Sequence, residues 1–285
     1  MKIAGLLTCY NRASKTEACL KRLQQILSKI DTVELFLFIT NDGSTDGTQK
    51  MLEEYQTVLN ITIIKGDGNM FWSGGMRAAW NKALEAEYFD GFLWINDDTC
   101  LKDSIFDEII ASQAYCMRQF KQCCISVGAT AANERGKLTY SGMKNRQKIV
   151  PTDTFQLCEM SNGNIVYIPM EVVRKIGIID KFYKHGIGDI DYTYTAYKKG
   201  IPIVLMRGYC GYCENDHNSK YGILCNKTIL ERYKYVMSPL GFQMREYIYF
   251  NKKFWPWKLP LVALAICSKI FCPKLEMKLR GINQQ

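Results

Sequence analysis

Apolar and polar residues alternate along the first hundred residues in blocks that switch between strand-like and helix-like spacing. Mostly apolar runs predict buried strands over Lys2–Cys9, Glu34–Thr40, Ile61–Lys65 and Gly91–Ile95. Between them, apolar residues recur every three or four positions, which predicts helices over Ser14–Ile30, Thr48–Leu59 and Gly74–Ala86. Strands that alternate with helices pair in parallel, so the pattern predicts an α/β fold with a sandwiched sheet.

Polar clusters follow three of these predicted strands, at residues 10–12, 41–46 and 96–98. In an open parallel sheet the ligand crevice lies outside the carboxyl ends of the strands. We therefore expect these clusters to line one ligand site.

The triplet Asn96-Asp97-Asp98 follows the apolar run Gly91–Ile95, and a second acidic cluster, Gly188-Asp-Ile-Asp191, lies further along the chain. Adjacent carboxylates at the end of a buried strand are suited to Mg²⁺ or Mn²⁺, held against a substrate diphosphate. The alternative interpretation is a polar strand end that caps a helix.

Other residues near the strand ends suit a nucleotide. Asp42 can accept the N3–H of a pyrimidine base, or it forms an ordinary Asx-turn. Thr8, Asn11 and Arg12 can contact the nucleoside or diphosphate, and glycines at 66–69 and 74–75 allow close approach of a ligand. The helix expected near Gly74 would direct its N–H groups at an anion. No dinucleotide fingerprint follows the first strand, and no Walker lysine motif occurs.

Composition and charge add a cellular context. With 285 residues, 47% hydrophobic and 23% charged, the chain is globular. Its 12 cysteines show no disulfide framework, and Met1 leads directly into a strand without a secretory signal, so we expect a cytoplasmic protein.

The net charge of +9 is concentrated at one end, because residues 220–285 carry 12 Lys and Arg against three Glu. Aromatics and lysines flank an apolar stretch from Leu259 to Cys272 that is too short and too interrupted for a membrane span, which needs about 20 apolar residues. Two interpretations stay open: a helix on an anionic membrane face, or a helix packed on the domain or on another subunit of a homo-oligomer. Without a recognised motif, we expect no nucleic-acid partner.

Four segments together resemble the successive signatures of family 2 glycosyltransferases: Thr8-Cys-Tyr-Asn-Arg12, Asn41-Asp-Gly-Ser-Thr-Asp46, Trp94-Ile-Asn-Asp-Asp98 and Gly188-Asp-Ile-Asp-Tyr192. The resemblance covers roughly residues 1–220. Trp72-Ser-Gly-Gly-Met76 and Ser161-Asn-Gly-Asn164 further resemble the bacterial rhamnosyltransferase-like and galactofuranosyltransferase-like branch.

The resemblance implies a GT-A fold, which is an α/β fold with a Rossmann-like, mostly parallel central sheet flanked by helices. It divides the chain into a glycosyltransferase domain over 1–220 and a basic, aromatic, helical C-terminal extension over 221–285. Within the domain, residues 1–100 would bind the nucleotide-sugar and residues 101–220 the acceptor. The extension would associate with a membrane or a subunit.

Carried over by motif, the resemblance implies specific residue roles. Asp98 and His217 would bind Mg²⁺ or Mn²⁺, although Asn96 stands where the literal Asp-x-Asp motif has its first acid. The base that deprotonates the acceptor hydroxyl would be Asp189, with Asp191 as the second choice. The acidic helix start around Asp191 is the structural alternative. The acceptor would meet Asn162, Gly163 and His185. The donor would contact Thr8, Asn11, Arg12, Asp42, Gly74, Gly75, Arg77, Asn96 and Asp97.

The expected activity is a metal-dependent inverting transfer of a sugar, with rhamnose the leading guess, from UDP or dTDP to a glycan or lipid-linked acceptor of surface polysaccharide. It would occur in the cytoplasm or on the inner face of the membrane. Two other classes stay open. A sugar-nucleotide pyrophosphorylase should carry a Gly-rich, Arg-containing loop after the first strand, which Tyr10-Asn-Arg-Ala-Ser14 lacks. A non-catalytic nucleotide-sugar-binding scaffold would not need Asp97, Asp98, Asp189 and Asp191.

Overall fold

A computed structural model describes residues 1–134, 136–214 and 220–279 of the chain. Its strands are β1 (Lys2–Cys9), β2 (Glu34–Asn41), β3 (Ile61–Lys65), β4 (Gly91–Ile95), β5 (Cys100–Leu101), β6 (Ile125–Ala131), β7 (Leu138–Tyr140), β8 (Gly142–Lys144), β9 (Gln147–Lys148), β10 (Gln156–Cys158), β11 (Met160–Ser161), β12 (Ile165–Pro169) and β13 (Ile203–Tyr212). Its helices are α1 (Ala13–Leu27), α2 (Thr48–Tyr55), α3 (Phe71–Ala86), α4 (Ile105–Phe120), α5 (Met170–Ile176), α6 (Gly188–Lys198), α7 (Lys220–Cys225), α8 (Ile229–Met237), α9 (Met244–Phe254), the 3-10 turn η1 (Pro256–Lys258), α10 (Leu259–Phe271) and α11 (Pro273–Leu279).

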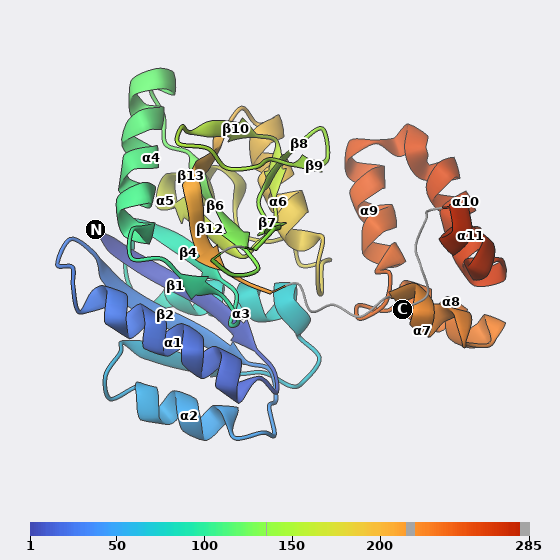
Figure 1. The fold of residues 1–285 in the computed structure, drawn as a ribbon, viewed down its shortest axis with the longest axis horizontal. Helices are drawn as coiled ribbons and strands as arrows, with labels where there is room; N and C mark the ends of the chain where they lie inside the picture. The colour runs from blue at the N-terminus through green and yellow to red at the C-terminus, as the bar shows by residue number, and fades with distance from the viewer. Residues whose placement is uncertain (135, 215–219, 280–285) are drawn as a thin grey trace. The chain divides into compact units, whose positions relative to one another are not determined.

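One mixed sheet organises the larger part of the chain, in the order β10-β13-β6-β12-β4-β1-β2-β3 (Figure 1). The four N-terminal strands, β4, β1, β2 and β3, pair in parallel. β12 is antiparallel to both of its neighbours, β4 and β6. A separate small sheet has the order β11-β8-β9. In this parallel half the carboxyl ends of β1, β2 and β4 lie side by side. The polar clusters that follow these strands are therefore neighbours, as expected from the sequence.

Both faces of the sheet are buried, which explains why its strands read as continuous apolar runs. Along β1, Ile3 and Leu7 face one core, whereas Ala4 and Leu6 face the other. The first core is completed by side chains of α1, α2 and α4. The second is completed by α3, α5 and α6, and includes the fully buried Trp80 and Trp94. The prediction of a mostly parallel sheet flanked by helices is confirmed.

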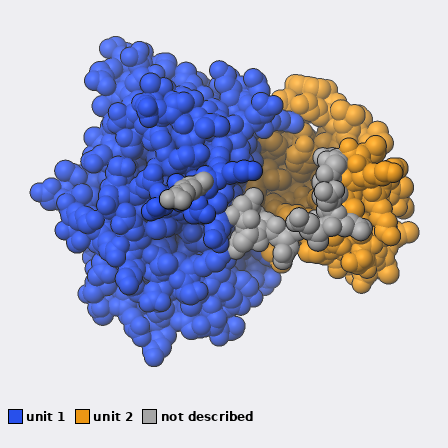
Figure 2. All heavy atoms as spheres, in the orientation of Figure 1, with its two compact units in different colours: residues 1–181, 188–215 blue, residues 182–187, 216–285 orange. Residues whose placement is uncertain are grey.

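The chain divides into two compact units, which Figure 2 colours separately. Unit 1 comprises residues 1–181 and 188–215 and contains the mixed sheet. Unit 2 comprises residues 182–187 and 216–285. The short segment 182–187 belongs to unit 2 because Phe182 stacks on Tyr249 at 4.0 Å between ring centroids, and the Lys184 N–H donates to Glu246 Oε1 over 2.9 Å.

Unit 2 is helical and has a small core of its own, which includes Tyr221, Leu224 and Met277. A buried ion pair joins α10 to α11: Lys269 Nζ lies 2.6 Å from Glu276 Oε1, and both side chains are less than a tenth exposed. The Tyr221 hydroxyl donates to the same glutamate over 2.9 Å. No helix among the described residues is long and apolar enough to cross a membrane.

Candidate functional site at the carboxyl ends of the parallel strands

The acidic pair after β4 meets a single arginine that follows β1. Arg12 Nη1 lies 3.3 Å from Asp97 Oδ1 and 2.9 Å from Asp98 Oδ2. β1 and β4 are neighbouring parallel strands, so residues just past their ends come together although they are far apart in sequence. The guanidinium supplies positive charge between two adjacent carboxylates that would otherwise repel each other.

The second oxygen of each carboxylate is also occupied. Thr16 Oγ1, on α1, donates to Asp97 Oδ2 over 3.2 Å, and Cys213 Sγ donates to Asp98 Oδ1 over 3.4 Å. Asp97 is only 5% exposed, and burial raises the pKa of its carboxyl group to about 6, against the opposing effect of the Arg12 charge. The two side chains are therefore held in fixed orientations, with one oxygen of each facing the Arg12 guanidinium.

The carboxylate oxygens of Asp97 and Asp98 are ligands that suit Mg²⁺ or Mn²⁺. Magnesium is commonly bound by one or two carboxylates together with substrate phosphate oxygens and water, rather than by a complete protein cage. Asp97 and Asp98 supply two adjacent carboxylates that already attract a cationic group. No cluster of three or more His, Cys, Asp and Glu side chains suited to a metal occurs in the described part of the chain. His217, the other predicted metal ligand, lies outside the described residues.

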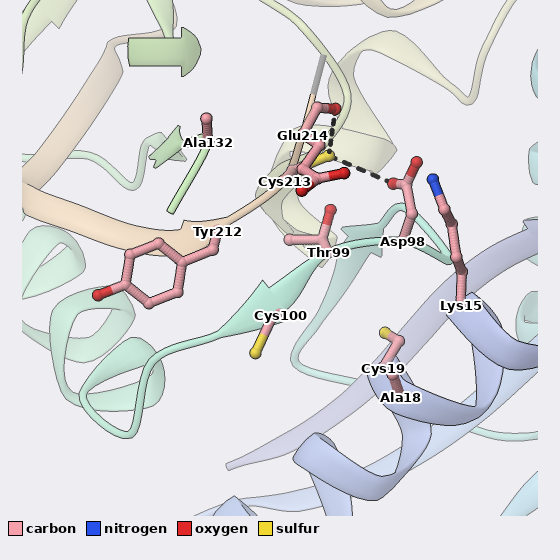
Figure 3. Close-up of a pocket in the computed structure, with 10 residues that line it drawn as sticks. All are labelled: Lys15, Ala18, Cys19, Asp98, Thr99, Cys100, Ala132, Tyr212, Cys213 and Glu214. Carbon is pink, nitrogen blue, oxygen red and sulfur yellow. Dashed lines mark hydrogen bonds between the residues drawn. The ribbon is translucent and has the colours of Figure 1, made fainter. Parts of the chain in front are cut away.

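Asp98 also lines a cavity of about 220 Å³ beside α1 (Figure 3). Lys15 and Cys19 of α1 form one wall, and Tyr212 and Cys213 at the end of β13 form another. In Figure 3 the Lys15 side chain extends next to the Asp98 carboxylate. Open space therefore adjoins the acidic pair.

Asp42, at the end of β2, binds the backbone at the start of α3. Its Oδ1 accepts the N–H groups of Gly68 (2.9 Å) and Met70 (3.3 Å), and its Oδ2 accepts that of Phe71 (2.9 Å). Because this carboxylate satisfies N–H groups that a helix start leaves unpaired, α3 begins at Phe71, three residues before the predicted start at Gly74. The anion at this helix start is thus Asp42 itself.

Glycines 74 and 75 occupy the first turn of α3, as expected for close backbone approach. Thr40 Oγ1 donates to the Gly75 carbonyl over 2.8 Å, and a Cβ on Gly75 would lie 2.1 Å from Thr8 Oγ1. Any side chain at 75 would therefore push α3 away from β1. A Cβ on Gly74 would meet Met70 Cβ at 3.2 Å.

Asn11 and Arg77 stabilise loops around the site. Asn11, with a φ of 49°, accepts the Thr45 N–H at its Oδ1 over 2.7 Å, which ties the loop after β1 to the loop after β2. Arg77 Nη1 donates to the carbonyl of Asp180 over 3.1 Å.

The candidate base lies at the first turn of α6. Asp189 Oδ2 accepts the Gly163 N–H over 2.8 Å. Burial raises the pKa of Asp189 to about 6, while hydrogen bonds from Ile190 and Gly163 limit the rise. A carboxylate of this pKa is a stronger base than an ordinary aspartate and is still mostly ionised at neutral pH. Asp191, the second candidate, is 3% exposed in the same helical turn.

Trp72 connects this base to the acidic pair, and sequence reasoning assigned it no role. Its indole N–H donates to Asn96 Oδ1 over 2.8 Å, and its ring packs edge-on against Trp94. A Cβ on Gly163 would lie 2.4 Å from that ring. The motif Trp72-Ser-Gly-Gly-Met76 was the only signal in the sequence. Thr16, Lys15 and Cys213, which contact or adjoin the acidic pair, had none, because they reach it from α1 and from the end of β13, which are distant in sequence from residues 97 and 98.

Two of the three predicted acceptor residues lie at the site. Gly163 contacts Asp189, and its neighbour Asn162 has a buried Oδ1 for which the described residues provide no hydrogen-bond partner. His185, in contrast, lies in the segment 182–187 that packs within unit 2. The structure thus brings together Arg12, Asn96, Asp97, Asp98, Gly163 and Asp189 in unit 1.

Comparisons with known proteins agree with this architecture. Residues 6–113 match the family model described as Glycosyl transferase family 2. S. aureus TarS 1-349 in complex with UDP is similar at 15% identity, over 100% of this chain and 93% of that chain, with a TM-score of 0.56. The mannosyltransferase PcManGT from Pyrobaculum calidifontis, in complex with GDP-Man and Mn2+, is similar at 15% identity, over 98% of this chain and 79% of that chain, with a TM-score of 0.51.

A longer S. aureus TarS chain is similar at 17% identity over 88% of this chain, with a TM-score of 0.49, and this chain spans 43% of its length. No curated protein matches the chain. At these identities the likeness concerns the fold, which is the GT-A fold predicted from the sequence.

Proposed function

We propose that this protein is a metal-dependent, inverting glycosyltransferase that transfers a sugar from UDP or dTDP to a hydroxyl group of a glycan or lipid-linked acceptor. The observation that carries the proposal is the linked arrangement of Arg12, Asp97 and Asp98 on one side and Asp189 on the other, joined through Trp72. The match of residues 6–113 to Glycosyl transferase family 2 supports it. So do the fold neighbours, which include TarS 1-349 in complex with UDP and a mannosyltransferase in complex with GDP-Man and Mn2+.

Donor binding is assigned to the ends of β1, β2 and β4. Thr8, Asn11, Arg12 and Asp42 would contact the nucleoside and diphosphate, with the α3 residues Gly74, Gly75 and Arg77 alongside. Asp42 would recognise the base with the lone pair that remains at Oδ2, because within residues 1–134, 136–214 and 220–279 that oxygen accepts only the Phe71 N–H. Asn96 and Asp97 would contact the sugar.

Asp98, with Asp97 beside it, would hold Mg²⁺ or Mn²⁺, and His217 is the further ligand proposed from the motif. When bound, the cation neutralises negative charge that grows on the leaving diphosphate. Arg12 already provides positive charge at the same carboxylates, so it would contribute to that neutralisation when a diphosphate is present.

Asp189 is the proposed general base. As the acceptor oxygen forms its bond to the anomeric carbon, the bond from that carbon to the diphosphate breaks, and the hydroxyl proton passes to the Asp189 carboxylate. Attack opposite the leaving group inverts the anomeric centre. The Gly163 N–H donates to Asp189 Oδ2 and the Ile190 N–H donates to Oδ1, so the proton would be received by a remaining lone pair of this carboxylate. Asn162 would position the acceptor through its buried Oδ1. His185 is the third residue proposed for the acceptor.

Donor sugar and cellular setting follow from the branch resemblance and the charge distribution. Rhamnose is the leading donor sugar, and a surface polysaccharide precursor is the leading acceptor. The proposed setting is the cytoplasm or the inner face of the cell membrane. The proposed division into a catalytic region over 1–220 and an extension over 221–285 is compatible with the two compact units.

Titration calorimetry with UDP, dTDP, GDP and ADP, each with and without Mn²⁺, tests the proposal. We expect metal-dependent binding of UDP or dTDP, followed by turnover of the matching nucleotide-sugar with a glycan acceptor. Metal-dependent binding without any sugar transfer or donor hydrolysis would instead favour a nucleotide-sugar-binding scaffold. Absence of binding by all four nucleotides in the presence of Mn²⁺ would contradict the proposal.

A further inference from the structure

Helix α10 is apolar on two opposite faces. Ile270 belongs to the core of unit 2, Ile266 packs against it, and Val262 is buried on the same side of the helix. Leu261, Leu264 and Phe271 recur on the other side at helical spacing and are 66%, 67% and 62% exposed. A helix of a water-soluble domain normally presents polar residues on its outer face. The exposed face of α10 is therefore built to contact something apolar.

Further exposed apolar side chains lie in the segments that precede and follow α10 in the chain. Trp257, in the turn η1, is 69% exposed, and Leu275 and Leu279 on α11 are 57% and 79% exposed. We call these six side chains, Trp257, Leu261, Leu264, Phe271, Leu275 and Leu279, the α10–α11 apolar face. All six belong to unit 2, shown in orange in Figure 2. Single exposed apolar residues are ordinary, but six within a short helical segment mark an interaction surface.

Between residues 247 and 279 the exposed charges all have one sign. Lys252, Lys253, Lys274 and Lys278 are exposed, and Lys258 is partly exposed. The only acidic residue from position 247 onward is Glu276, which is buried in its ion pair with Lys269. The described part of the chain beyond residue 246 therefore presents positive charge to solvent with no exposed carboxylate.

This combination favours one kind of partner. A second copy of the chain, docked symmetrically through the same face, would bring two sets of lysines together, and residues 247–279 offer no exposed carboxylate to pair with them. Phosphates of a nucleic acid would suit the lysines but would leave the leucines and Phe271 without an apolar contact. An anionic bilayer provides both an apolar layer and negative headgroups at the depth of the lysines.

We propose that the α10–α11 apolar face inserts into the interfacial region of an anionic lipid bilayer, with α10 lying parallel to the membrane plane. The leucines, Phe271 and Trp257 enter the boundary between headgroups and acyl chains, and the surrounding lysines bind lipid phosphates. The 13 residues of α10 are too few to cross the bilayer, so the helix lies on it.

The test is co-sedimentation of the full chain with vesicles, without nucleotide, so that the result does not depend on glycosyl transfer. The vesicles contain either phosphatidylcholine alone or phosphatidylcholine and phosphatidylglycerol in a ratio of about 7:3. We expect at least about tenfold tighter binding to the anionic vesicles, and a large loss of binding when salt is raised from about 0.1 M to about 0.5 M.

Two double variants separate the apolar contribution to vesicle binding from the electrostatic one. Leu261→Gln/Leu264→Gln removes apolar contacts and should weaken binding to anionic vesicles at both salt concentrations. Lys274→Gln/Lys278→Gln should weaken it about tenfold at low salt and have little effect at high salt. Matched controls in unit 1 are Leu84→Gln, at an exposed leucine of α3, and Lys50→Gln, at an exposed lysine of α2; both should bind like the wild type.

Equal binding to both kinds of vesicle, or equal effects of the control and test variants, would overturn the proposal. The proposal would also be overturned if the wild type did not bind lipid and light scattering showed a dimer that the leucine variant dissociates. The α10–α11 apolar face would then bind a second copy of the chain. Light scattering without vesicles and circular dichroism of each variant distinguish these outcomes from misfolding.

Discussion

The indole N–H of Trp72 donates a 2.8 Å hydrogen bond to Oδ1 of Asn96. This bond joins the first turn of α3 to the residue that precedes Asp97 and Asp98. The same indole ring covers Gly163, whose N–H holds the carboxylate of Asp189. One side chain thus fixes the separation between the proposed donor-binding carboxylates and the proposed base.

Trp72→Phe keeps an aromatic ring and removes the hydrogen bond. We expect kcat/KM to fall about tenfold, with a loss of about 1 kcal/mol in unfolding free energy, because Asn96 would keep a part-buried oxygen without its donor. Steady-state kinetics and thermal melting measure the two effects. Tyr88→Phe, at an exposed aromatic residue outside the site and outside the α10–α11 apolar face, is the control and should change neither. Normal kinetics in the Trp72 variant would show that Asn96 needs no positioning.

Asp189→Asn removes the proposed base while keeping the size of the side chain. We expect turnover to fall by about 10³ and donor binding to change less than about twofold, since general-base catalysis contributes on this scale. Single-turnover kinetics and calorimetry provide the two readouts. Asp153→Asn, at an exposed aspartate, is the control. Near-normal turnover would exclude Asp189, and the same measurement on Asp191→Asn would then test the second candidate.

The pKa of Asp189, raised to about 6, predicts two pH dependences. Activity should decline below about pH 6, because the protonated carboxyl group cannot act as a base. Stability should change in the opposite direction. The folded-state pKa lies above that of the unfolded chain, so this contribution to stability is complete below about pH 4 and is lost as pH rises through about 6.

The stability effect of Asp189 is at most about 3 kcal/mol, from a shift of roughly two pKa units. Urea unfolding of the wild type and of Asp189→Asn across this pH range measures it. The wild type should lose stability relative to the variant as pH rises. Parallel pH profiles for the two proteins would contradict the raised pKa.

Arg12→Gln should make stability depend on metal. Without the guanidinium, the buried Asp97 carboxylate loses its nearest positive charge, and we expect a loss of about 1–2 kcal/mol, moderated by the partial exposure of Arg12. Mn²⁺ should recover more stability in this variant than in the wild type, because a cation at the two carboxylates replaces the missing charge. Thermal melting with and without Mn²⁺ measures this difference. Arg207→Gln, which breaks a pair with Glu108 elsewhere in unit 1, should show no metal-dependent recovery.

Lys269→Met tests the buried ion pair of unit 2. The change leaves Glu276 buried without its cationic partner, so α10 and α11 should lose about 3–5 kcal/mol of local stability. Hydrogen exchange of amides in these two helices is the measurement. The double variant Lys269→Met/Glu276→Leu should recover much of the loss, whereas equal exchange in the single and double variants would show that the charge is not the cause.

The strands and the acidic pair could be predicted because their signals are local. β1, β3 and β4 have the predicted bounds, and Asp97 and Asp98 lie directly after β4. The start of α3 was misplaced because its cap, Asp42, is supplied by another strand, and spacing within the helix does not reveal such a partner.

The other structural features that the sequence did not predict depend on contacts between residues far apart in the chain. The run Ile165–Pro169 pairs antiparallel with β4, an arrangement that no nearby residue specifies. The hydrogen bond from Thr16 to Asp97 and the packing of Trp72 on Gly163 each bridge distant elements. Periodicity indicates which face of a helix is buried but not which residue lies opposite, so these contacts need the fold.

Asp42 gives the proposed base recognition a spectroscopic consequence. Its carboxylate already accepts the N–H groups of Gly68 and Phe71. A nucleobase that donates to the same carboxylate would therefore weaken or strengthen these two hydrogen bonds. The chemical shifts and exchange rates of the two amides should then differ between a bound uracil or thymine and a bound purine. The preferred base could be identified from two backbone signals before any sugar donor is in hand.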